Sequence, residues 1–161
     1  MTKTRFAQKT VVSSDRSRAE IEKVLGRYGA DGFAYATNRD QAMIGFRMHA
    51  RMIRYTVMMP DPQSPEFQLT PSRKWKRTPE EAGKLYQAAC WQRWRALLLV
   101  IRAKLEATEA GITTFEEEFL AWTVLPDNTT VGQSVLLRIA EAYKTGEPPM
   151  LLEAGVLRPS P

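Results

Sequence analysis

One long predicted helix constrains the fold of this chain more than any other feature. Thr78-Pro79-Glu80-Glu81 has the spacing of a capping box with proline at the first helical position. The helix can continue to Ala110, where Gly111 ends it, which makes about 32 residues and about 48 Å at 1.5 Å per residue. Its middle, Leu97 to Ile101, is apolar on every side. We therefore expect other elements to surround it.

Three further helices are predicted around it. Ser17 and Glu20 have capping-box spacing, and a helix over about Arg16 to Tyr28 places its apolar residues on one face. Thr113 and Thr114 are candidate caps of a short helix that carries three glutamates. Thr130 and Gln133 open the last helix. Its residues expected to face inward are Val135, Leu136, Ile139 and Tyr143.

The region between the first and the long helix has β pattern. Phe33 to Thr37 is a short predicted strand, and Ala42 to His49 with Met52 to Met59 predicts a hairpin that turns at Ala50-Arg51. This register segregates apolar side chains on one face and polar ones on the other. The predicted pairs are Met48–Ile53, Phe46–Tyr55 and Ile44–Val57 on the inner face, and Arg47–Arg54 and His49–Met52 on the outer face.

These elements predict an α+β fold, with a small antiparallel three-stranded sheet packed against a long central helix and with further C-terminal helices. Residues 1–13 are expected to be a basic flexible arm and residues 14–146 a single domain. Within it, residues 60–79 hold five prolines and no periodicity, which indicates a long loop. Residues 147–161 are expected to be a C-terminal tail.

The composition limits the classes of function. The chain has 161 residues, with 23 Lys and Arg against 18 Asp and Glu, a net charge of +5 and a pI near 9.5, which suits a polyanionic partner. Cys90 is the only cysteine, so it cannot form an intrachain disulfide or a cysteine-based zinc site. The longest apolar run, Ala96 to Ile101, is too short to span a bilayer. We expect a soluble, cytoplasmic protein with no membrane contact.

The strongest candidate for ligand binding is a basic run in the proline-rich loop: Arg73, Lys74, Trp75, Lys76 and Arg77. The four cations can bind phosphates while the indole stacks on a base. The alternative is a solvated loop whose tryptophan packs against the domain.

Two other sets of residues are candidates for binding phosphate groups. Arg47 and Arg54, with His49, lie on the outer hairpin face, where they meet either a phosphate backbone or an acidic group of the fold such as Asp40. Lys84, Trp91, Arg95 and Arg102 fall within about 20° of one line on the long helix. That line also contains apolar residues, so its arginines can instead pair with Glu106, Glu109 or the glutamates of the third helix.

Few residues of this sequence are candidates for a catalytic role. His49 is the sole histidine, no serine or cysteine has a base near it in sequence, and neither a P-loop nor a dinucleotide fingerprint is present. Glu116-Glu117-Glu118 suits a carboxylate-only magnesium site of a nuclease, but the helix macrodipole explains three acids at a helix N-terminus more simply. We therefore predict a protein that is not an enzyme, with no catalytic residue, metal or cofactor.

Two segments carry a resemblance to a known group of proteins. Arg93-Trp94-Arg95-Ala96-Leu97-Leu98-Leu99 and Phe119 to Asp127 resemble a family of uncharacterised bacteriophage and prophage proteins, over about Ser14 to Leu152. The resemblance implies a phage setting in a bacterial host cell and transfers no functional residue. Together with the basic run, it predicts a non-catalytic accessory protein that binds DNA or RNA in replication, recombination or regulation. The alternative is a phage inhibitor or adaptor that binds a host protein or protein–nucleic-acid machine.

Overall fold

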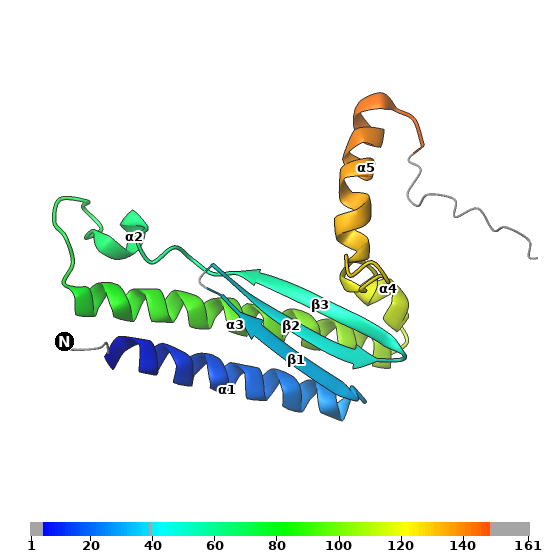
Figure 1. Ribbon diagram of the computed structural model, residues 1–161, viewed down its shortest axis with the longest axis horizontal. Helices are drawn as coiled ribbons and strands as arrows, with labels where there is room; N and C mark the ends of the chain where they lie inside the picture. Colours follow the sequence, from blue (N-terminus) through cyan, green and yellow to red (C-terminus); the bar gives the residue numbers. More distant parts are fainter. Residues whose placement is uncertain (1–4, 39, 149–161) are drawn as a thin grey trace, which may run out of the picture.

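The computed structural model describes residues 5–38 and 40–148, with side chains from Arg16 onward, and confirms the predicted α+β fold (Figure 1). A three-stranded antiparallel sheet is followed by the long helix and by shorter C-terminal helices. The elements are α1 (Arg5–Arg27), β1 (Gly32–Thr37), β2 (Gln41–Met48), β3 (Arg51–Met58), α2 (Pro65–Gln68), α3 (Pro79–Glu109), α4 (Phe115–Phe119), the 3-10 helix η1 (Leu120–Trp122) and α5 (Val131–Thr145).

The sheet has the order β1-β2-β3, and its inner face forms the core with α1 and α3. The apolar residues predicted on this face are buried, except that Val57 is only partly so. Tyr35 of β1 contacts Trp94 of α3, with ring centroids 5.7 Å apart. The predicted packing of the sheet on the long helix is therefore confirmed. The α3 side chains in this core include Trp94, Leu98, Ile101 and Leu105.

The predicted hairpin register is wrong by two residues. The turn is His49-Ala50, and Ile44 pairs with Tyr55 rather than with Val57. Both turn residues have positive φ, 51° and 58°, as a two-residue turn that follows the twist of the strands requires. Because the error is an even number of residues, the side chains paired in the strands keep their predicted face. His49, predicted on the outer face, instead lies in the turn with its ring against Phe115.

The helix α1 begins earlier than predicted. It starts at Arg5, within the segment expected to be a loosely held arm, so Ser17 and Glu20 lie inside the helix and do not cap it. Figure 1 shows α1 and α3 side by side and running in the same direction beneath the sheet. Residues 1–4 of the expected arm lie outside the described residues.

The long helix is confirmed to within one residue at its C-terminal end. Thr78 accepts a hydrogen bond from the Glu81 backbone amide, and the Glu81 carboxylate accepts one from the Thr78 amide, so both halves of the predicted capping box form. The expectation that its apolar middle is surrounded is wrong in part. Leu97, Leu98 and Ile101 are buried, but Leu99 and Val100 point away from the sheet and are 55% and 45% exposed.

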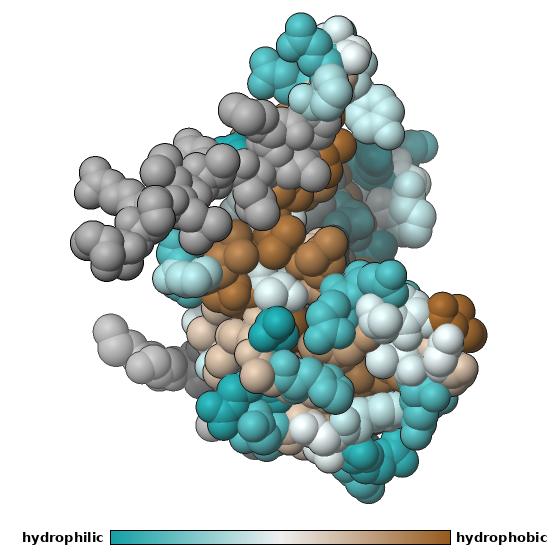
Figure 2. Space-filling model, turned by 90° about the vertical axis from the view of Figure 1, so that its right-hand side faces the viewer, coloured by the Kyte–Doolittle hydropathy of each residue, from teal (hydrophilic) through white to brown (hydrophobic). Residues whose placement is uncertain are grey.

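The last helix stands apart from the body (Figure 1). Its predicted capping box, Thr130 with Gln133, forms. The expectation for its apolar face is wrong in part, because Val135 and Ile139 are only partly buried and Leu136 is exposed. Gly132 is its only buried residue and lies against Ala121, whereas Tyr143 is 89% exposed. Figure 2 shows hydrophobic side chains gathered at this end of the molecule. None of the described helices combines the length and hydropathy needed to cross a bilayer.

Candidate nucleic-acid interface

The basic run lies on an ordered turn rather than in an irregular loop. Leu69 and Lys76 form an isolated antiparallel bridge, and the Thr70 amide donates to the Trp75 carbonyl at 2.9 Å. The Arg77 amide donates to the Gln68 carbonyl at 2.8 Å and completes the base of the turn. The expectation of a long loop is thus wrong in part, because α2 (Pro65–Gln68) and this bridged turn lie within it.

Two side chains hold the turn in place, one against α3 and one within the turn itself. Phe67 of α2 is buried and meets the edge of Tyr86, with ring centroids 5.7 Å apart. The Arg77 Nε donates to the Leu69 carbonyl at 2.8 Å, so this cation serves the turn itself. We therefore separate Arg77 from the remaining basic residues of the run.

The end of the turn presents cations and an indole to solvent. Trp75 is 72% exposed, and Arg73, Lys74 and Lys76 are exposed around it. Within the described part of the chain, no carboxylate pairs with these three cations. Arg73 has a φ of 55°, and its amide donates to Thr70 at 2.7 Å, so the backbone reverses here in a defined conformation. We call Arg73, Lys74, Trp75 and Lys76 the tip cluster.

The predicted row on α3 lies along a groove against α1. The Arg95 guanidinium stands over the Trp91 ring at 5.3 Å from its centroid, and both line a groove of about 100 Å³ with Arg102. Ser17 and Glu20 form the α1 wall of this groove. Sequence reasoning assigned those two residues to a helix cap and so missed them. Lys84 is paired with Glu80 at 2.8 Å, with both side chains exposed.

The two arginines of the sheet are held by the fold. They do not face each other, because Arg47 lies opposite Met52 and Arg54 opposite Gly45. Arg47 Nε lies 2.7 Å from Asp31, and this hydrogen bond raises the pKa of the guanidinium. Arg54 donates to the side chain and the carbonyl of Asn128, at 3.0 and 2.7 Å. Partners within the fold therefore account for both arginines, although these partners are not the predicted ones.

The ten candidate residues do not form one surface. The proline-rich segment packs near Tyr86 on α3, whereas Trp91 faces α1. These two positions are five residues apart, which separates them by about 140° around the helix. The two arginines of the sheet lie elsewhere again, at β2 and β3. Of the two tryptophans in these sets, Trp75 of the tip cluster is 72% exposed, whereas Trp91 is 43% exposed and lies beneath the Arg95 guanidinium.

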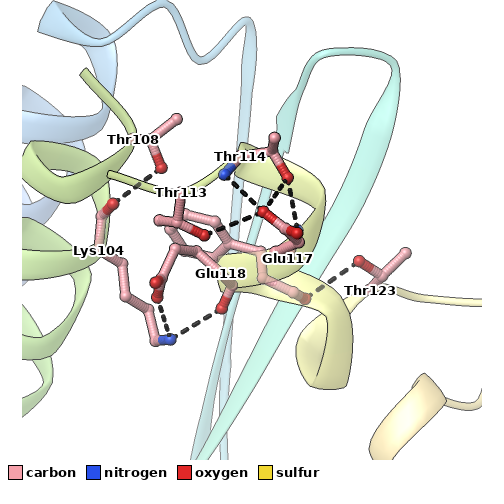
Figure 3. Close-up of polar contacts among 8 residues, drawn as sticks. Lys104, Thr108, Thr113, Thr114, Glu117, Glu118 and Thr123 are labelled. Carbon is pink, nitrogen blue, oxygen red and sulfur yellow. Dashed lines mark hydrogen bonds and ion pairs between the residues drawn. The ribbon is translucent and has the colours of Figure 1, made fainter. Parts of the chain in front are cut away.

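The glutamates of α4 have structural partners. Glu117 completes a capping box with Thr114, and the hydrogen bonds it accepts there lower the pKa of its carboxyl group. Glu118 pairs with Lys104 of α3 at 2.8 Å and ties the two helices together (Figure 3). Among the residues that the structure describes, no group of three His, Cys, Asp or Glu side chains is arranged to hold a metal ion.

The sole cysteine and the sole histidine of the chain are also engaged by packing. Cys90 is buried in α3, and burial raises the pKa of its thiol, which disfavours the reactive thiolate. His49 lies in the β2–β3 turn with its ring 4.9 Å from that of Phe115.

No family model, curated protein or solved structure matches this chain. Its function is therefore inferred from the geometry of its own residues.

Proposed function

We propose that this chain is a non-catalytic nucleic-acid-binding protein of phage origin that serves replication, recombination or regulation, and that the tip cluster is its contact surface. The observation that carries the proposal is the exposure of Trp75 among three cations on an anchored turn. An exposed indole is costly to leave in water, while unpaired bases offer it a stacking surface and phosphates offer the cations a counter-charge.

The anchored turn also supports this use. Phe67 packs on Tyr86 of α3 and Arg77 closes the base of the turn, so the tip residues are presented together. Less conformational freedom is given up when such a preordered surface binds. The positive N-terminal end of α3 follows directly after the turn, and Glu80 and Glu81 offset part of its charge.

The test measures binding to single-stranded and double-stranded DNA and RNA as a function of salt. Changing Arg73, Lys74 and Lys76 to Ala should reduce the slope of log K against log salt by about 0.7–0.9 for each phosphate that the variant no longer neutralises. A matched control removes three exposed cations of α1, Arg16, Lys23 and Arg27, and should leave the slope nearly unchanged. No affinity of the intact protein at low salt, or equal slopes for the two variants, would contradict the proposal.

The indole is tested separately. Trp75→Ala should weaken binding to single strands by roughly 1–3 kcal/mol with little change in salt slope, because a neutral ring releases no counterions. Trp91→Ala, which changes the groove between α1 and α3, is the matched control. If Trp91→Ala weakens binding more than Trp75→Ala does, the contact surface lies along that groove.

A second candidate function, binding a host protein as an inhibitor or adaptor, is favoured by α5. Leu136, Leu137 and Tyr143 are exposed on α5, whose one buried residue, Gly132, lies in its first turn. Amphipathic helices of this kind dock in apolar grooves of partner proteins. A photo-crosslinking residue at position 136 should then form one dominant adduct with a host protein, and one at Glu141, about 140° away around α5, should not. Equal labelling from both positions would count against this function.

A further inference from the structure

The helix α3 has a second face, opposite its core face, on which apolar side chains are exposed. Its core face, centred on Trp94 and Ile101, is covered by the sheet and α1. On the opposite side, Leu85 and Leu99 are exposed. A solvated helix face is normally polar, so this face needs a separate explanation. We call it the outer stripe of α3: Leu85, Ala89, Gln92, Ala96, Leu99, Ala103, Glu106 and Ala110.

The outer stripe follows a heptad repeat. One series recurs every seven residues from Leu85 through Gln92 and Leu99 to Glu106, and a second series consists of alanine at each position from Ala89 to Ala110. The two series alternate at spacings of four and three, which is the pattern of a coiled-coil seam. The seam is about 38 Å long at 1.5 Å per residue. The core of the chain does not require this repeat, because the core face of α3 is a different set of residues. Two residues of the stripe do meet α1: Glu106 accepts a hydrogen bond from the Tyr28 hydroxyl, and Leu99 borders the groove between the two helices.

The composition of the two series favours a second copy of the chain as the occupant. In an antiparallel pair the two series face each other, so each larger side chain meets an alanine across a two-fold axis between residues 97 and 98. A parallel pair would stack leucine on leucine and alanine on alanine, which demands an uneven separation of the axes. The antiparallel layers are Leu85 with Ala110, Gln92 with Ala103, Leu99 with Ala96 and Glu106 with Ala89, each second residue from the other copy.

Charge and area set the strength of such a pair. Lys84 of one copy lies near the level of Glu109 of the other copy, so opposite charges favour pairing at the ends of the seam. Arg95 of one copy lies near the level of Arg102 of the other copy, so like charges oppose pairing near the middle. A seam of about 38 Å by about 10 Å contributes roughly 400 Å² from each copy. A total of about 800 Å² is small for a specific interface and corresponds to weak, reversible association.

We propose that the outer stripe of α3 is a self-association surface, through which two copies of this chain form a weak antiparallel dimer. Sedimentation equilibrium of the full chain, from about 10 μM to about 1 mM, should show a reversible monomer–dimer equilibrium. Leu99→Glu should weaken it at least about tenfold, and Leu137→Glu on α5, the same change at another exposed leucine, should not. A monomer throughout the concentration range, or equal behaviour of the two variants, overturns the proposal.

The antiparallel direction has its own test. In a Cys90→Ala background, the double variant Gln92→Cys with Ala103→Cys should form an intermolecular disulfide, because the two positions meet across the axis. They are about 16 Å apart within one helix, so an intrachain bond is excluded. Gln92→Cys alone should not crosslink, since that residue meets Ala103 and not itself. Equally efficient crosslinking of this single variant would indicate a parallel pair and overturn the proposed geometry.

Discussion

The proline-rich segment from Pro60 to Pro79 and the helix α5 differ in how regular secondary structure relates to attachment to the rest of the protein. The proline-rich segment has little regular structure, yet Phe67 is buried on α3 and Arg77 closes the turn that carries the tip cluster. The helix α5 is regular and fully capped, yet Gly132, which lies against Ala121, is its one buried residue. Regularity follows from short-range sequence signals, whereas attachment depends on a few buried side chains whose partners lie far away in the sequence.

The largest expected effect lies in the proline-rich segment. Phe67→Ala should lower the free energy of unfolding by roughly 3 kcal/mol, because it removes the ring that packs on Tyr86 and anchors this segment. Urea denaturation measures the change, and Trp75→Ala, at an exposed position, should stay within about 0.5 kcal/mol. Similar destabilisation in the two variants would mean that Phe67 is not the anchor.

The attachment of α5 rests on a glycine. A Cβ at Gly132 would lie 2.9 Å from the Ala121 carbonyl oxygen, so Gly132→Ala should destabilise the chain by about 1–3 kcal/mol through overpacking. Gly26→Ala in α1, where a Cβ meets nothing within 4 Å, should instead stabilise by up to about 1 kcal/mol. Thermal unfolding compares the two variants, and the same sign for both would contradict the described packing.

The caps of the helices should differ in their response to acid. Hydrogen bonds from Thr78 and Thr114 lower the pKa of the Glu81 and Glu117 carboxyl groups below the ordinary value of 4.5. The stability that these two hydrogen-bonded carboxylates contribute is therefore fully present above pH 4.5. It is lost as the pH falls through the lowered pKa of the folded state. The corresponding residue of α5 is Gln133, which does not titrate.

An NMR titration from about pH 6 to about pH 2 checks this difference. The amide protons of Thr78 and Thr114 should shift as their carboxylate partners become protonated, and the amide of Thr130 should shift much less. Glu81→Gln should remove the titration at Thr78 alone. A shift at Thr130 as large as the other two would show that general acid unfolding, and not cap protonation, is being observed.

The smallest effect is expected on the exposed face of α5. Leu137 is 81% exposed, so Leu137→Ala should change the free energy of unfolding by no more than about 0.5 kcal/mol. Urea denaturation of the full chain measures it beside Phe67→Ala. A decrease above about 2 kcal/mol would mean that another part of the chain covers this face in solution.

Signals within a few residues predict the local structure correctly. The three Thr-based capping boxes form, at Thr78, Thr114 and Thr130, and the apolar alternation of the strands identifies the buried sheet face. The start of α1 is missed because the prediction relies on apolar periodicity. The signal that could have found it is the absence of glycine and proline before Gly26, which leaves nothing to interrupt a helix.

The prediction errors concern which residues contact each other rather than which helices and strands form. The hairpin turns at His49-Ala50, which lacks the Asn-Gly or Asp-Gly signature, and a shift of two residues preserves the faces that the prediction used. Arg54 meets Asn128, more than seventy residues away, and no spacing rule in the sequence links them. The exposure of α5 is an error of the same kind, because an apolar periodic face predicts a helix but not what covers it.

The parallel arrangement of α1 and α3 also bears on how the chain is synthesised. Leu25 of α1 and Leu105 of α3 belong to one core, but the ribosome makes them about 80 residues apart. At a translation rate of about 5–20 residues per second, roughly 4–16 s pass between the synthesis of α1 and the completion of α3, which covers part of its apolar face. The nascent chain therefore exposes a hydrophobic helix for seconds, whereas the β2–β3 hairpin, joined by two residues, can pair as soon as it emerges. For this protein, the rate of translation and access to chaperones become determinants of folding yield.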